Sequence, residues 1–279
     1  MDGLLANSSE GSVSLVAESY KLPRILDEEE KETVRRQTAV SDYKRMKVKN
    51  ELRKNWDKFY LRNKNNFFKD RWWTQHEFGQ LLSSHINLEG NLHFLEVGCG
   101  VGNTVFPLTQ LYPHWTFQAF DFSDNAIKLL CERCDQNNVF INTAVADLTS
   151  ENLSLNFPLA DIASLIFVLS SIPPEKQQQA IKNLTGLLRP QGIVVVRDYG
   201  INDHAMLRYG RECKLDERFY AKQDGTVAYY FQLEEVDRLF QQKGFHKVTS
   251  MYLSRKTVNH QKNLSVDRVF IQAAYMKSL

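Results

Sequence analysis

The chain has 279 residues, of which 43% are hydrophobic and 24% charged, enough for one full globular core with appendages. A net charge of +2 gives no bulk argument for a nucleic-acid or membrane-surface protein. Four cysteines without framework spacing and no apolar run near the ~18 residues of a membrane span argue against a disulfide-rich or membrane-spanning protein. We therefore expect a cytoplasmic or nuclear protein. The CxxC pair of Cys131 and Cys134 lacks a second pair, so it is interpreted as helix packing and no metal is expected.

The N-terminal part divides by composition. Residues 1–22 are rich in Ser, Gly and Glu without periodicity, which predicts a mobile tail. The acidic run at 27–30 supplies an N-cap and first-turn acids, and it predicts one long helix from Asp27 toward Trp56. Residues 23–90 are interpreted as a basic and aromatic helical segment ahead of the main domain.

The strongest local charge asymmetry lies between Lys44 and Arg71, with 11 Lys/Arg against 3 Asp/Glu and several interleaved aromatic residues. A solvated helix face, with its aromatic side chains docked on the core, is the structural alternative. Phosphate pairing combined with base stacking is the usual way in which proteins hold RNA, so the interleaving favours an RNA surface.

From residue 92 onward, short apolar segments alternate with helical stretches, which predicts a parallel sheet in a doubly wound α/β domain over residues 91–279. The pattern breaks at an aromatic-rich insertion over 198–231. The predicted strands are 92–97, 115–120, 139–145, 160–168, 193–197 and a final one at 268–275; the predicted helices include 125–136, 175–188 and 233–243.

The segment LEVGCGVGN (95–103) places three glycines where a strand turns into a helix, and glycine allows both a sharp turn and close approach of a ligand. Asn103 stands where the dinucleotide fingerprint GxGxxG requires its third glycine, which disfavours NAD. Gly98 and Gly100, with Glu96 two residues before the turn, are therefore candidate cofactor residues.

Acidic residues recur after the next two predicted strands, at Asp121 and Asp147. Because parallel strand ends line one crevice, both acids and the glycine loop converge on one ligand. Asp121 is expected to accept hydrogen bonds from two ribose hydroxyls and Asp147 one from an adenine amino group, with Ile166 as an apolar wall. The alternative, that each acid only caps the following helix, stays open, although Ser123 is an equally good cap.

Beyond the glycine loop, five further segments are informative. They are NWDKFY (55–60), NFFKDR (66–71), IFVLS (166–170), RDYG (197–200) and DHAMLR (203–208). In these segments the chain resembles the eukaryotic tRNA 3-methylcytidine methyltransferases, and the resemblance runs nearly end to end along the chain.

The resemblance implies a seven-stranded, Rossmann-like class I methyltransferase fold with S-adenosylmethionine as cofactor. It implies that residues 23–90 contact both RNA and cofactor, and it adds Trp56, Tyr60 and Leu148 to Gly98, Gly100, Asp121, Asp147 and Ile166 as cofactor-binding residues. The short N-terminus resembles the branch that modifies serine tRNAs in the anticodon loop and works with seryl-tRNA synthetase.

Methylation at N3 of neutral cytosine requires no strong base, because N3 carries a free lone pair, so positioning should dominate. The product base is cationic, and Asp198 and Asp203, just past the fifth predicted strand, are the candidate catalytic carboxylates. Capping of the local turn is an equally good reading of Asp198. The target base must be unpaired or flipped, and Phe67, Phe68 or Tyr199 could stack on it.

Three alternatives remain at this level. A small-molecule methyltransferase would use the 198–231 insertion as a lid, and a noncatalytic RNA or synthetase adaptor would keep the fold without turnover. An NAD-dependent oxidoreductase is disfavoured by Asn103 and by the lack of a clear catalytic dyad.

Overall fold

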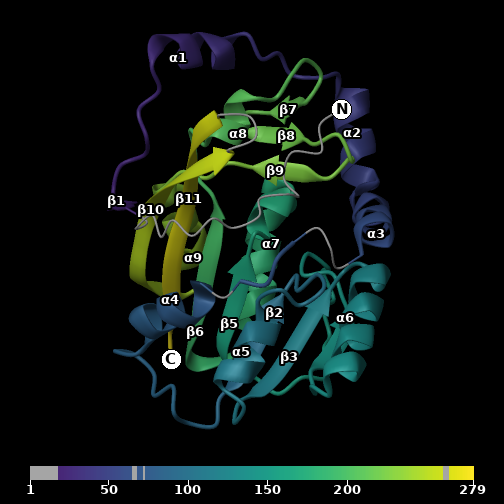
Figure 1. The fold of residues 1–279 in the computed structure, drawn as a ribbon, viewed down its shortest axis with the longest axis vertical. Helices are drawn as coiled ribbons and strands as arrows, with labels where there is room; N and C mark the ends of the chain where they lie inside the picture. The colour runs from purple at the N-terminus through teal and green to yellow at the C-terminus, as the bar shows by residue number, and fades with distance from the viewer. Residues whose placement is uncertain (1–17, 65–67, 72, 260–263) are drawn as a thin grey trace.

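A computed structural model of the chain describes residues 18–64, 68–71, 73–259 and 264–279 (Figure 1). Its centre is a sheet in which β2 to β6 run parallel and the last three strands, from β11 outward, are antiparallel. The strands lie in the order β1 (Glu18–Tyr20), β10 (Phe245–Asn259), β11 (Leu264–Lys277), β6 (Leu188–Tyr199), β5 (Ala160–Ile166), β2 (His93–Val97), β3 (Thr116–Asp121) and β4 (Asn142–Val145).

Helices cover both faces of this sheet, which confirms the doubly wound α/β prediction. One face carries α4 (Trp73–Leu82), α5 (Val105–Leu111) and α6 (Asp124–Asn137), and the other carries α7 (Pro174–Thr185) and α9 (Leu233–Gln241). Alternation along β6 explains the two layers, since Ile193 and Val195 join one core and Val194 and Val196 the other. The seven strands from β10 to β4 form the expected methyltransferase sheet, and β1 extends its edge.

The prediction of one long N-terminal helix is wrong, because the segment forms α1 (Glu28–Arg35), α2 (Asp42–Asn50) and α3 (Leu52–Asn63). Asp27 caps α1 in a capping box, as its sequence position suggests, but the chain then leaves the helix. The backbone N–H of Val40 donates to the carbonyl of Lys214 at 2.9 Å, and Ser41 caps the restart. Strand β1 lies inside the 1–22 segment predicted to be mobile; residues 1–17 fall outside the described part of the chain.

The 198–231 insertion folds into α8 (His204–Leu207) and a small antiparallel sheet of β7 (Lys214–Asp216), β8 (Phe219–Ala221) and β9 (Val227–Tyr229). A single 3-10 turn, η1 (Leu169–Ser171), follows β5. Strand β10 was not among the predicted strands, and a bulge between Lys247 and Thr249 breaks its alternation. Figure 1 shows α2 and α3 along one side of the molecule, from the small sheet down to α6.

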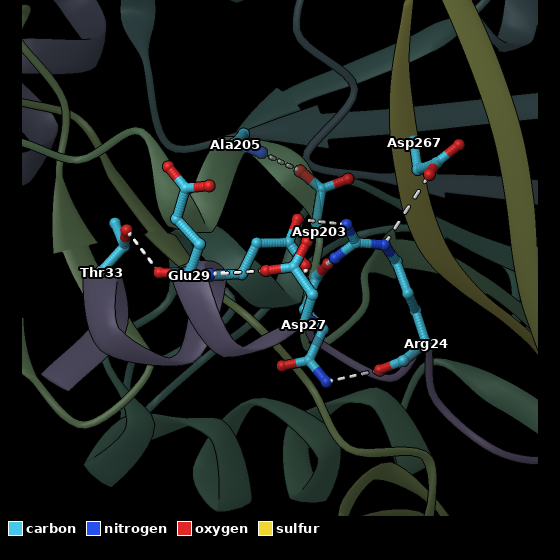
Figure 2. A network of polar contacts seen from close by, with 9 residues as sticks. Arg24, Asp27, Glu29, Thr33, Asp203, Ala205 and Asp267 are labelled. Carbon is cyan, nitrogen blue, oxygen red and sulfur yellow. Dashed lines mark hydrogen bonds and ion pairs between the residues drawn. The ribbon is translucent and has the colours of Figure 1, made fainter.

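Asp203 joins this insertion to the main sheet. Its carboxylate caps α8 by accepting from the Ala205 N–H at 2.8 Å (Figure 2). It also accepts from Arg268 Nε at 2.9 Å and from the Val269 N–H at 2.7 Å. The side chain of Asp203 is 0% exposed, so all three donors compensate a fully buried charge. Asp203 therefore holds α8 against β11.

Arg24, from the segment ahead of α1, reaches the same region. Its guanidinium lies 3.8 Å from Asp267, whose side chain is 40% exposed, and its carbonyl accepts from Asn202 Nδ2 at 2.7 Å (Figure 2). The N-terminal segment thus packs on the outside of the insertion. The ion pair of Arg24 with Asp267 is a weak surface contact.

Replacing Asp203 with Asn should lower the free energy of unfolding by about 3–5 kcal/mol, because the Arg268 charge loses its buried partner. The matched control, Asp267→Asn, should cost less than about 1 kcal/mol, because that pair is partly exposed and its charged atoms are 3.8 Å apart. Urea denaturation at constant pH measures both, and equal small losses would contradict the role assigned to Asp203.

Candidate active site

The loop between β2 and α5 depends on glycine at two positions. Gly98 has φ +61° and Gly100 φ +54°, in the left-handed region that side chains disfavour. A Cβ built on Gly98 would lie 2.7 Å from Val168 Cγ2, and one on Gly100 would lie 2.6 Å from the Tyr60 hydroxyl. The sequence therefore specifies a bare backbone at this turn.

Asp121 closes the loop from the neighbouring strand. Its two carboxylate oxygens accept from the N–H groups of Gly100 and Ser123, each at 2.9 Å. The side chain is buried, and this burial raises its pKa to about 6. Glu96 acts similarly one strand away: it accepts from the Val105 N–H at 2.9 Å at the start of α5, and burial raises its pKa to about 7.

The remaining predicted cofactor residues follow the ends of adjacent parallel strands. Register pairs Asp121 at the end of β3 with Val145 at the end of β4, so Asp147 and Leu148 lie just beyond that edge. Asp147 is exposed and accepts from the Thr149 N–H at 2.7 Å, whereas Leu148 is buried. Ile166 ends β5, which pairs with β2, so all these positions lie at one edge of the sheet.

Helix α3 brings the N-terminal segment against this edge. Asp57 accepts from the Ser123 hydroxyl at 2.6 Å, and the Asn125 side chain donates to its carbonyl at 3.2 Å. Trp56 and Tyr60 stack on the same helix with ring centroids 5.8 Å apart. The Trp56 Nε1 atom is buried and has no hydrogen-bond partner among the described residues, which leaves a donor for a ligand.

A cavity of about 360 Å³ opens beside Trp56. Its walls combine aromatic rings with three cationic side chains and two serine hydroxyls. The lining residues are Trp56, Phe68, Lys69, Asp70, Arg71, Phe167, Ser170, Ser171, Tyr199, Lys222 and Val227.

Phe167 shapes this cavity from an unusual backbone conformation. Its φ is +62°, which is rare for an aromatic residue and typical of functional sites. The conformation places its ring 5.0 Å from Tyr199 and under the Arg71 guanidinium at 5.1 Å. The Arg71 guanidinium also donates to the carbonyl of Ile166 at 3.2 Å. This bond links the cavity to the edge of the sheet where the predicted cofactor residues lie, called the cofactor edge below.

The two predicted catalytic acids lie in different places, and neither lines the cavity. Asp198 is fully buried directly behind the wall, where it accepts from the N–H groups of Ser170 and Tyr199, each at 2.9 Å. Burial raises the pKa of Asp198 to about 6. Asp203 is bound to α8 and β11, and its position gives no geometric support to a catalytic role.

Of the three stacking candidates, Phe68 and Tyr199 line the cavity, and Phe67 lies outside the described residues. Trp56, which the resemblance gave as a cofactor residue, also lines it, and sequence reasoning did not single out the remaining lining residues. Arg71, Phe167 and Ser170 do belong to motifs that carry the family resemblance, which is the signal that could have found them. Lys222 belongs to no such motif and is visible only in the fold.

Two groups of cationic residues on α2 and α3 behave differently. Lys49 and Arg53 form ion pairs of 2.7 Å with Glu175 and Asp124, so they dock the helices on the main domain. Lys54, Lys58 and Arg62 repeat every four residues along α3, are exposed, and form no ion pair within the described ranges. Those three define a basic ridge on the outer face of α3.

Two further searches cover the described residues only. No group of three or more His, Cys, Asp or Glu side chains has the arrangement of a metal site there. No helix of that part of the chain has the length and apolarity to cross a bilayer. Cys131 and Cys134 are unbridged and lie on α6, with Cys134 packed in the core.

Two solved structures with the same fold are S-adenosylmethionine-dependent methyltransferases. One from Anabaena variabilis has a TM-score of 0.58 at 16% identity over 81% of this chain and 94% of that chain. One from Clostridium acetobutylicum has a TM-score of 0.55 at 12% identity over 81% and 99%. A methyltransferase domain family matches residues 95–194. These likenesses confirm the predicted methyltransferase fold, and with the matched methyltransferase domain they support S-adenosylmethionine as the cofactor.

Sequence relatives are more specific. The human tRNA N(3)-cytidine methyltransferase METTL6 is 42% identical over 257 residues, covering 91% of this chain and 90% of the relative. The Schizosaccharomyces pombe tRNA N(3)-methylcytidine methyltransferase trm141 is 37% identical over 245 residues, covering 86% and 98%. This agreement in sequence, together with the cofactor edge and the neighbouring cavity, confirms the resemblance: the chain belongs to the tRNA N(3)-cytidine methyltransferase family.

Proposed function

We propose that this enzyme transfers the methyl group of S-adenosylmethionine to N3 of an unpaired cytidine in the anticodon loop of serine tRNAs. We further propose that seryl-tRNA synthetase is its partner and that it works in the cytoplasm or nucleus. One observation supports the reaction most. Helix α3, which carries Trp56, lies between the cofactor edge with its glycine loop and the aromatic, cationic cavity, so the two sites are neighbours.

The residues at the edge fit the cofactor. Gly100 permits the sharp turn beside Asp121, Asp121 offers buried carboxylate oxygens, and the Trp56 indole N–H has no acceptor among the described residues. In this proposal, S-adenosylmethionine is held by Trp56, Tyr60, Gly98, Gly100, Asp121, Asp147, Leu148 and Ile166. When bound, the cofactor supplies the electrophilic methyl group, and the chain contributes orientation and electrostatics.

The cavity is suited to a flipped cytidine, because Phe167 and Tyr199 offer stacking surfaces beside hydrogen-bonding groups. The lone pair on N3 needs no general base. Asp198, held behind Ser170 and Tyr199, places a negative charge where the product base becomes positive, and it acts through space rather than by contact. We assign Asp203 to the fold and not to the chemistry.

The basic ridge of Lys54, Lys58 and Arg62 contacts the phosphate backbone of the RNA outside the cavity. Phosphate contacts of this kind position a nucleic acid without reading its sequence. They also make binding salt-dependent, which a small-molecule methyltransferase would not show.

Cofactor affinity should fall as the pH falls below about 6. Ribose hydroxyls donate to the ionised Asp121 carboxylate, and its pKa of about 6 means that protons compete for it in that range. Calorimetric titration of S-adenosylmethionine between pH 5 and pH 8 measures this. Asp121→Asn should bind the cofactor weakly, and its affinity should no longer fall near pH 6. A pH profile in that variant equal to that of the wild type would contradict the assignment.

The activity test is methylation of total tRNA with labelled S-adenosylmethionine, with and without seryl-tRNA synthetase, followed by mass spectrometry of the digested nucleosides. New 3-methylcytidine in serine tRNAs is the expected result, and its increase with the synthetase would support the partner. The control, Asp121→Ala, should lose cofactor binding and product but keep RNA binding. An absence of product with cofactor binding intact would overturn the proposal in favour of a small-molecule substrate.

A further inference from the structure

Lys222 comes to the cavity on a rigid turn between β8 and β9. The backbone N–H of Lys222 donates to the carbonyl of Thr226 at 2.7 Å, and its backbone carbonyl accepts from the Gly225 N–H at 3.0 Å. Asp224 fastens the same turn by accepting from the N–H and the hydroxyl of Thr226 at 2.9 and 2.7 Å. The backbone that carries Lys222 is therefore fixed before any ligand binds.

Helix α3 supports this turn from outside. The side chain of Asn55 donates to the carbonyl of Gly225 at 3.0 Å. Gly225 has φ +80°, and a Cβ there would lie 2.6 Å from Asn55 Nδ2, so only glycine permits the contact. Asn55 precedes Trp56, and the helix that lines the cavity also holds the turn that carries its lysine.

The Lys222 side chain lines the cavity, and its ammonium has no hydrogen-bond acceptor among the described residues. It lies 5.7 Å from the centre of the Tyr199 ring and donates no hydrogen bond to any described residue. The acids nearby are already engaged: Asp224 accepts from Thr226 in the turn, Asp198 accepts backbone N–H groups behind the wall, and Asp70 pairs with Arg133 at 2.6 Å. A lysine with three donors and no acceptor in such a cavity is suited to an anionic ligand.

The two strongest acceptors of a bound nucleotide for this ammonium are the cytosine carbonyl and a backbone phosphate. Contact with the base would place a positive charge beside a product that is itself cationic, which opposes the reaction. Contact with phosphate neutralises the lysine and leaves the base free to carry its charge. Lysine is a compact charge and a common phosphate ligand.

We propose that Lys222 binds the backbone phosphate of the flipped nucleotide and so makes the cavity selective for a nucleotide within a chain over a free nucleoside. The inference rests on the proposed function, because it takes the cavity to be the site of the target nucleotide. It assigns to the insertion a substrate-binding residue separate from the basic ridge of α3.

The first test compares cytidine with cytidine 5′- and 3′-monophosphate by direct calorimetric titration, so it does not require turnover. The wild-type protein with S-adenosylmethionine bound should bind one monophosphate at least about tenfold more tightly than cytidine, and Lys222→Ala should lose that preference. Lys222→Arg should keep it within a few-fold. Equal affinities for cytidine and both monophosphates in the wild type would overturn the proposal.

The second test uses tRNA. Lys222→Ala should raise the KM for tRNA about tenfold or more, leave the affinity for S-adenosylmethionine unchanged, and reduce the salt slope of tRNA binding by about one. Lys182→Ala, an exposed lysine on α7, is the matched control and should behave as wild type. Loss of kcat with unchanged KM would contradict a phosphate contact.

The two proposals fail differently. A nucleotide preference that depends on Lys222 without formation of 3-methylcytidine would reject the proposed reaction and support the phosphate site. Formation of 3-methylcytidine with no role for Lys222 in either test would do the reverse.

Discussion

The docking of helix α3 positions both halves of the active site. Asn55 bonds to the turn that carries Lys222, and Asp57 bonds to Ser123 and Asn125 at the start of α6. Trp56 lies between these contacts, over the cavity. A hydrogen bond to a charged group contributes about 1.5–3 kcal/mol, so the Asp57 contact is a substantial part of this docking. The side chain of Ser123 contacts α3 while its N–H binds Asp121, which links the helix directly to the cofactor loop.

Three buried acids, Glu96, Asp121 and Asp198, lie around this centre, and burial raises the pKa of each. A raised pKa in the folded state means that the ionised carboxylates cost folding free energy. The stability that each acid contributes is complete below its unfolded pKa, near 4, and is lost as the pH rises through about 6 to 7. At neutral pH these ionised acids therefore lower the stability of the folded state. They provide negative charge beside a sulfonium cofactor and a cationic product, and such destabilising charges are typical of functional sites.

Much of the main domain could be predicted from sequence, because its signals are local. Glycines at the strand-to-helix turn, an acid at the next strand end and the alternation along β6 each follow from turn chemistry or periodicity within a few residues. The placement of Gly100, Asp121 and Ile166 at one edge then follows from parallel topology. Trp56 and Tyr60 became candidates only through the family resemblance, and the structure places both on α3, where Tyr60 packs on the loop and Trp56 over the cavity.

The remainder depends on contacts between distant segments. The N-terminal helix breaks because Val40 bonds to Lys214, some 170 residues away, and no local pattern encodes that pairing. Asp203 was a reasonable catalytic candidate near the fifth strand, but its partners Arg268 and Val269 come from β11. Lys222 stands in an insertion without periodicity, and its place in the cavity is fixed by Asn55 from the other end of the chain.

The most direct test of the central role of α3 is the dissociation constant of S-adenosylmethionine for Asp57→Ala, measured by calorimetry beside Lys58→Ala. Asp57 is not among the proposed cofactor ligands, yet its loss releases Ser123 and the start of α6 from α3. The account predicts at least about tenfold weaker binding for Asp57→Ala, about 1.4 kcal/mol, and unchanged binding for Lys58→Ala. Cofactor affinity equal to wild type in Asp57→Ala would contradict it.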